Sequence, residues 1–235
     1  MSAPKRFWTD VAVIESGGGY AVALDGKPIK TPAKQDFIAP TRALAEAIVA
    51  EWAEQGERMN PKAMPQTRYV NSVIDGIKPQ RAAIVEAVAA YGASDLLCYR
   101  AEHPDALIAQ QAERWDPLLS WAALTYDAPL VLAAGVMPVT QPQPSLNRLS
   151  RAVEAHHDFA LAGLHDLVSI SGSLILGLSV SAGRLSPDEA LSLSRLDEHW
   201  QIEQWGDDEE AAETAAKKAV DFAEAARLIS LTKDA

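Results

Sequence analysis

Acidic side chains stand among apolar residues in the segment 191–206, and such carboxylates can do two kinds of chemistry. Asp197, Glu198 and Glu203 share this segment with Trp200 and Trp205, two of the six tryptophans in the chain. A pair of carboxylates can act as general acid and base, or it can hold a basic group in a charge-assisted hydrogen bond. Nothing in the spacing of Asp197 and Glu198 favours catalysis over structure or binding. An enzyme that uses this carboxylate pair is therefore kept as an alternative function.

Other reactive side chains lack the spacing that chemistry requires. Cys98 is the single cysteine and lies in an apolar run without a histidine, so we expect a buried, inert thiol. His156 and His157 are neighbours, and their rings would leave a helix in different directions, which does not suit a metal site. The only Gly-Lys pair, Gly26-Lys27, has Ala21 where a phosphate loop needs its first glycine. We predict no cofactor, no metal and no small-molecule substrate.

Composition excludes several classes of partner. The net charge of −11 and the pI of about 4.9 oppose binding to nucleic acid or to an anionic membrane surface. The most apolar stretch, 167–182, is too short to span a bilayer and is interrupted by serines and glycines, so we predict no membrane insertion. A single cysteine and the lack of an apolar signal sequence at the start of the chain favour the cytoplasm.

The first third of the chain has the pattern of a small sheet covered by a helix. Alternating apolar residues between 7 and 38 predict a meander of short strands, with turns at 17–19 and at Asp25-Gly26. Thr41 is a good N-cap for a helix that carries Leu44, Ile48 and Trp52 and stops at Gly56. A linker at 76–79 then places a domain boundary, with a β-rich N-terminal domain at 1–78 and a helical domain at 79–235.

The second domain is predicted to be entirely helical, which makes the fold class α+β. Helices are expected at 80–91, at 104–115 and 117–126 with Pro117 as a kink or break, and at 146–166. The apolar stretch after them is expected to present a ridge of small residues that lets another helix approach closely. This ridge consists of Ser169, Ser173, Gly177 and Ser181.

The penultimate helix is the most informative element. A capping box at 186–189 predicts its start and Gly206 its end. At 100° per residue it has two apolar stripes on opposite sides, with Glu203 in the first and Glu198 in the second, so it needs two partners. The second partner can be another protein; the alternative is a helix buried inside its own domain with both glutamates bonded internally. The stripes are Leu193, Leu196 and Trp200, and Leu191, Ile202 and Trp205.

Blocks of sequence spread over most of the chain point to a family. They are Glu51-Trp52; Met64 to Arg68 with Asn71; Asp95 to Glu102; Trp115 to Leu118 with Trp121-Ala122; and Leu193 to Glu198 with Trp205-Gly206. In these blocks the chain resembles the chaperones that assemble the F-type ATP synthase and hold its alpha subunit, the Atp12 family. The resemblance implies a β-rich N-terminal domain, a helical C-terminal domain and no catalysis. It also implies a client, the unassembled alpha subunit, which is kept from aggregating until the beta subunit replaces the chaperone.

The resemblance further implies an essential acidic residue in the C-terminal helical motif, which we place at Glu198, with Glu203 as the second choice. A generic protein-binding adaptor remains the main alternative function. The expected compartment is the bacterial cytoplasm, or the mitochondrial matrix for a processed organellar form. The predicted partner-binding residues are Glu198, Trp205, Ile202, Asp197, Glu203 and Trp52.

Overall fold

The computed structural model describes residues 4–135, 137–206 and 209–235. The chain forms two compact units, and each includes segments from distant parts of the sequence. Unit 1 comprises Met1–Arg81, His157–Ala162 and Arg227–Ala235, and unit 2 comprises Ala82–His156 and Gly163–Ala226. The predicted division into 1–78 and 79–235 differs from these units, because His157–Ala162 and Arg227–Ala235 belong to unit 1. As a division into domains it stays a prediction.

Unit 1 contains a small antiparallel sheet. Its central strand β2 (Gly19–Leu24) pairs with β1 (Val11–Ser16) and also with the short β3 (Lys27–Pro28) and β4 (Ile38–Ala39). Gly17 and Gly18 have φ values of 62° and 79°, and Asp25 and Gly26 have values of 48° and 78°. Both predicted turns are therefore confirmed, and each uses the positive φ that glycine adopts without strain.

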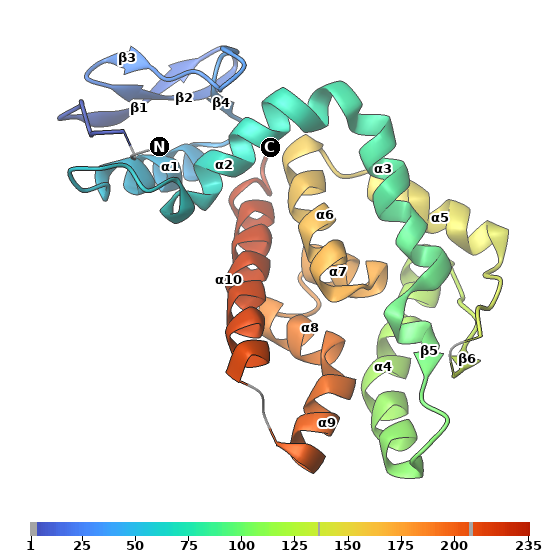
Figure 1. Cartoon of the computed structure of the whole chain (residues 1–235). Helices are drawn as coiled ribbons and strands as arrows, with labels where there is room; N and C mark the ends of the chain where they lie inside the picture. The colour runs from blue at the N-terminus through green and yellow to red at the C-terminus, as the bar shows by residue number, and fades with distance from the viewer. Residues whose placement is uncertain (1–3, 136, 207–208) are drawn as a thin grey trace. The chain divides into compact units, whose positions relative to one another are not determined.

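Helix α1 (Arg42–Ala53) covers one face of this sheet (Figure 1). The Thr41 hydroxyl caps it by accepting a hydrogen bond of 3.2 Å from the Leu44 amide, as predicted. Leu44 and Ile48 are fully buried in the core of unit 1, and Trp52 lies partly buried at its edge. The sequence pattern therefore identified both the cap and the face that covers the sheet.

The predicted linker at 76–79 is wrong, because helical structure continues through it. Helix α2 (Pro65–Ser72) runs into a π-helical turn at Val73–Ile77 and a 3₁₀ turn at Lys78–Gln80, and α3 (Arg81–Ala90) follows directly. Pro79 is tolerated because it lies in the first turn of a new helical segment, where its missing N–H has no intrahelical partner.

In the part of the chain that the structure describes, unit 2 is mostly helical, as predicted, with the exception of a pair of two-residue strands. The parallel strands β5 (Tyr99–Arg100) and β6 (Ala133–Ala134) form this exception. Helices α6 and α10 contribute residues to both units. No helix among the described residues combines the length and the hydropathy that a bilayer crossing requires. The helices are α4 (Asp105–Tyr126), α5 (Gln143–Glu154), α6 (Asp158–Ser171), α7 (Leu174–Ser181), α8 (Pro187–Ser194), α9 (Leu196–Trp205) and α10 (Glu209–Leu231).

Two of the predicted helix boundaries are wrong. Pro117 lies inside the single helix α4 and does not divide it. Pro117 and Glu113, whose carbonyl loses its helical donor, are both on the exposed side of α4, where water can replace the hydrogen bond. The expected helix 146–166 is in fact two helices, because the chain leaves helical geometry between α5 and α6.

The predicted ridge of small residues is interrupted. Gly172 has a φ of 70° and ends α6, and Ser173 caps α7 through a hydrogen bond of 3.1 Å from the Leu176 amide. Ser169 and Ser173 therefore do not lie on one continuous helix with Gly177. Close packing does occur at Gly177, where a Cβ atom would lie 2.6 Å from Cγ2 of Val168.

Candidate functional site

The segment 186–206 forms two helices, so the prediction of one continuous helix is wrong. The capping box is present: the Glu189 amide donates to the Ser186 hydroxyl (3.2 Å), and the Ser186 amide donates to the Glu189 carboxylate (2.9 Å). Helix α8 then ends at Ser194, because Arg195 has φ −108° and ψ 19°. The freed carbonyl of Leu193 accepts a hydrogen bond of 3.0 Å from the indole N–H of Trp115 on α4. This tertiary partner compensates for the break.

Helix α4 also holds the first turn of α9. Gln111 is fully buried; its amide nitrogen donates to Asp197 (2.8 Å), and its oxygen accepts from the Ala101 amide (2.9 Å). Asp197, one of the predicted partner-binding residues, is therefore partly buried and bonded within unit 2. This hydrogen bond joins the first turn of α9 to α4.

The first face of α9 is directed at α4. Leu196 is buried, and Trp200 is partly buried. Trp200 and Glu203 line a hollow of about 180 Å³ together with Gln110 and Arg114 of α4. The predicted first stripe thus has its partner inside the protein, and Glu203 lies exposed at the edge of that hollow.

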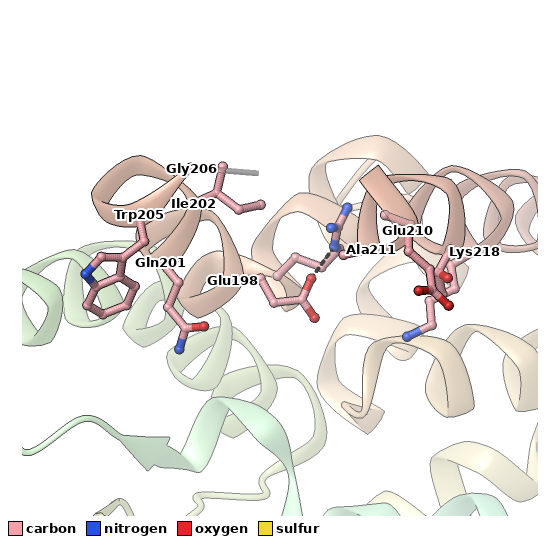
Figure 2. Close-up of a pocket in the computed structure, with 11 residues that line it drawn as sticks. Glu198, Gln201, Ile202, Trp205, Gly206, Glu210, Ala211 and Lys218 are labelled. Atoms are coloured by element: carbon pink, nitrogen blue, oxygen red, sulfur yellow. Dashed lines mark hydrogen bonds and ion pairs between the residues drawn. The ribbon is translucent and has the colours of Figure 1, made fainter. Parts of the chain in front are cut away.

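The second face of α9 borders an open groove. Glu198, Ile202 and Trp205 form one wall and residues of α10 form the other, around a volume of about 600 Å³ (Figure 2). The side chain of Trp205 is 79% exposed, which is high for so large an apolar group. The alternative of a helix buried centrally in its own domain is therefore wrong for this face.

An ion pair orients the Glu198 carboxylate. The Arg195 guanidinium donates to it at 2.7 Å, an interaction drawn as the dashed line at Glu198 in Figure 2. The Glu198 side chain is still 58% exposed. Glu198 thus has an internal partner and also faces solvent. Arg195 was missed from the sequence, although its spacing of three residues from Glu198 is a helical pairing signal. Lys218 of α10 was also missed, and only the tertiary structure brings it to the groove.

Trp52, the remaining predicted binding residue, belongs to unit 1 and the α9 residues to unit 2. Its ring packs edge-to-face on Trp8 with centroids 4.9 Å apart. Both indole N–H groups are buried without a hydrogen-bond partner among the described residues. Packing within unit 1 therefore already covers part of the Trp52 side chain.

The other reactive side chains have structural partners. Burial raises the pKa of the Cys98 thiol to about 12, which agrees with the expected inert core residue. The ring of His156 lies 2.8 Å from the Ser181 hydroxyl, and that of His157 lies 3.0 Å from the Thr232 carbonyl oxygen. In the part of the chain that the structure describes, no three His, Cys, Asp or Glu side chains converge as metal ligands.

Comparison with known proteins identifies the family. Residues 5–123, about half of the chain, match the family described as ATP12 chaperone protein. The chain belongs to the ATP12 chaperone family. The predicted resemblance is thereby confirmed, and the family name describes a chaperone, in agreement with the prediction of a protein that is not an enzyme.

Solved structures and a fungal relative extend the match to the rest of the chain. The crystal structure of Atp12 from Paracoccus denitrificans is 46% identical, with a TM-score of 0.95 over 97% of this chain and 98% of that one. The Atu1473 protein of Agrobacterium tumefaciens is 43% identical, with a TM-score of 0.93 over 97% and 85%. Mitochondrial atp12 of Schizosaccharomyces pombe is 24% identical over 225 residues, 89% of this chain and 76% of that protein. The two solved structures therefore share the α+β fold predicted here.

Proposed function

We propose that this ATP12-family chaperone binds the unassembled alpha subunit of the F-type ATP synthase and keeps it from aggregating until the beta subunit takes its place. Family membership supports the chaperone role. We assign client binding to the groove between α9 and α10 because of one observation: Trp205 is largely exposed there, beside charged residues. The bacterial cytoplasm is the proposed compartment, because structural relatives come from Paracoccus and Agrobacterium.

The groove has the physical features that a reversible chaperone needs. An orphan subunit exposes apolar surface that aggregates unless it is covered. A large aromatic anchor with a charged rim can cover such a surface while allowing later release, because aromatic hot spots supply most of the binding energy of small interfaces. Trp205 and Ile202 provide the apolar contact, and Glu198 provides the charge.

We assign each predicted residue a role in this interaction. Trp205 and Ile202 are the anchors, and the exposed part of the Glu198 carboxylate pairs with a basic group of the client. Asp197 positions α9 through Gln111. Glu203 contributes charge on the other side of α9, and Trp52 remains a proposed contact from unit 1.

Affinity measurements test the surface directly. We expect Trp205→Ala and Glu198→Lys each to weaken binding of purified alpha subunit at least about tenfold, because they remove a central anchor and reverse a charge. The matched control is Leu124→Ala, which truncates an apolar residue that is 87% exposed on α4 of the same unit. If both groove variants fold normally and capture the alpha subunit at full affinity, this surface is not the binding site.

Partner identity separates the chaperone from a generic adaptor. We expect the tagged protein to retain the alpha subunit from cell extract, and added beta subunit to displace it. Isolation of other proteins without any ATP synthase subunit would favour the adaptor. Binding of alpha that beta cannot displace would contradict the proposed release by competition.

A further inference from the structure

The two walls of the groove have the same helical spacing. On each helix four of the lining residues lie at positions i, i+3, i+4 and i+7, so these four form one continuous ridge along that helix; Glu210 on α10 lines the groove beside its ridge. The ridge of α9 consists of Glu198, Gln201, Ile202 and Trp205, and the ridge of α10 consists of Ala211, Thr214, Ala215 and Lys218.

We propose that this groove binds an amphipathic helix of the client, which packs between α9 and α10 as the third helix of a three-helix arrangement. The proposal rests on the proposed function, because it names the kind of alpha-subunit segment that the groove accepts. In helix-in-groove recognition the bound helix carries its apolar anchors at i, i+3, i+4 and i+7, and these anchors can pack between two ridges such as those of α9 and α10.

The dimensions and side chains suit a short helix. Each ridge covers eight residues, which corresponds to about 10 Å along a helix axis, or two turns. Ala211 and Ala215 on α10 are small, so a partner helix can approach within the usual ~8–10 Å between helix axes. On the opposite wall, Ile202 and Trp205 are the large apolar side chains that line the groove.

Backbone chemistry favours a helix over an extended segment. The walls of the groove are helices whose own amides and carbonyls are hydrogen-bonded along the helix axis, and neither wall is a sheet edge. An extended peptide between them would leave its backbone N–H and C=O groups without partners. A helical segment satisfies those groups internally and presents only side chains to the walls.

Charges at the two walls define which helix fits. Figure 2 shows Glu198 and Lys218 extending from opposite walls. Glu198 remains largely exposed beside Arg195, whereas the α10 wall carries both Lys218 and Glu210. The complementary ligand is therefore a helix with an apolar stripe and with a basic residue on the flank that meets α9.

Blocking the groove tests the proposal. We expect Ala215→Trp to weaken binding of purified alpha subunit at least about tenfold, because its ring would occupy the space of the client helix. Ala216→Trp is the matched control, since Ala216 is the next residue on α10, is exposed and does not line the groove, and its affinity should stay within about twofold of the wild type. Thr214→Trp, at an exposed groove position, should weaken binding as Ala215→Trp does, which guards against a folding defect at Ala215.

Photo-crosslinking tests for a helix. A benzophenone amino acid in place of Gln201 should attach to one segment of the alpha subunit, at residues spaced by three or four. Crosslinks spaced by two, or spread over unrelated segments, would overturn the proposal.

Sedimentation of the free protein tests whether a second copy of this chain occupies the groove instead. If the free protein is a dimer and Ala215→Trp dissociates it, a second copy fills the groove, and the proposal is overturned.

These outcomes are distinguishable from failure of the proposed function. If Trp205→Ala weakens alpha-subunit binding and neither Ala215→Trp nor Thr214→Trp does, the chaperone function stands and the helix in the groove is wrong. If the wild-type protein does not bind the alpha subunit at all, the proposed function itself fails and the inference fails with it.

Discussion

Asp197 and Glu198 are adjacent carboxylates in the sequence, but their surroundings in the structure differ. Asp197 accepts a hydrogen bond from the buried Gln111, and Glu198 pairs with Arg195 at the edge of an open groove. Both lie in the first turn of α9, where the helix dipole favours negative charge. Position on the helix therefore decides which carboxylate fixes structure and which is available to a partner.

Asp95 is the strongest case of a carboxylate held in the interior. It is fully buried and accepts hydrogen bonds from the Ser173 hydroxyl (2.8 Å) and from the amides of Ile175 and Leu97 (both 3.0 Å). Burial raises the pKa of this carboxyl to about 6, while the hydrogen bonds act to lower it. Asp95 thereby connects the segment after α3 with the start of α7.

A pH prediction follows for Asp95. The folded state holds the proton more tightly than the unfolded state, whose pKa is 3.8, so the stability from protonation is present below pH 3.8 and is lost as pH rises through about 6. We expect the free energy of unfolding of the wild type, relative to Asp95→Asn, to increase by on the order of 1–3 kcal/mol from pH 7 to pH 4.5. Urea unfolding of both proteins measures it, and a pH-independent difference would contradict the raised pKa.

Only part of the site was predictable at the scale of residues. The spacing of Glu198, Ile202 and Trp205 identified one face of α9 because all three lie beyond the helix break. Lys218 was not predictable, since its place at the groove depends on how α10 packs against α9. Residues that meet across two helices carry no shared signal in a single sequence.

At the scale of elements, local signals were predictable and helix continuity was not. Thr41 and the capping box at Ser186 act within three residues, so the sequence contains the whole interaction. The break at Arg195 depends on Trp115, 78 residues from the Leu193 carbonyl that it satisfies. Hydrophobic periodicity alone therefore predicted one continuous helix. It could not show that a distant side chain stabilises the junction between α8 and α9 at Arg195.

The junction between α8 and α9 gives an element-scale prediction. Asp197→Asn keeps the oxygen that accepts from Gln111, so we expect alpha-subunit affinity within about twofold of the wild type. Asp197→Ala leaves the Gln111 amide group unsatisfied, and we expect it to lower the free energy of unfolding by about 1–3 kcal/mol and to weaken binding several-fold by releasing α9. Urea unfolding and binding measured on the same samples test both effects. Equal losses of affinity in the two variants would instead mean that the Asp197 charge contacts the client.

At the scale of the whole molecule, the core of unit 1 draws on the middle and the end of the chain. Phe159, Ala162 and Leu228 pack with the sheet and α1 residues in one hydrophobic cluster. The Thr41 hydroxyl donates to the Leu231 carbonyl oxygen at 2.6 Å, and Nε2 of His157 lies 3.0 Å from the Thr232 carbonyl oxygen. No pattern in 1–78 indicates that its core needs these later residues, because hydrophobic periodicity reports a buried face and not what covers it.

The C-terminal segment is therefore expected to stabilise the N-terminal sheet. A chain that ends at residue 226 loses Leu228, which is fully buried, together with the carbonyl that Thr41 binds. Loss of one buried leucine alone costs about 2–5 kcal/mol, so we expect unit 1 of the shortened protein to unfold at markedly lower urea concentration. Hydrogen exchange of the β2 amides, measured by mass spectrometry, reports on unit 1 separately from unit 2.

Two variants make this test specific. Removal of 233–235 alone, which are exposed, should change stability by less than about 0.5 kcal/mol. Leu228→Ala in the full chain should reproduce much of the loss, whereas Val220→Ala, an exposed position on the same helix, should not. If β2 amides keep full protection in the chain that ends at 226, the fold of the N-terminal sheet does not depend on residues 227–235. Loss of protection in β2 with α7 unaffected would instead show that the fold of the N-terminal sheet depends on the last residues of the chain.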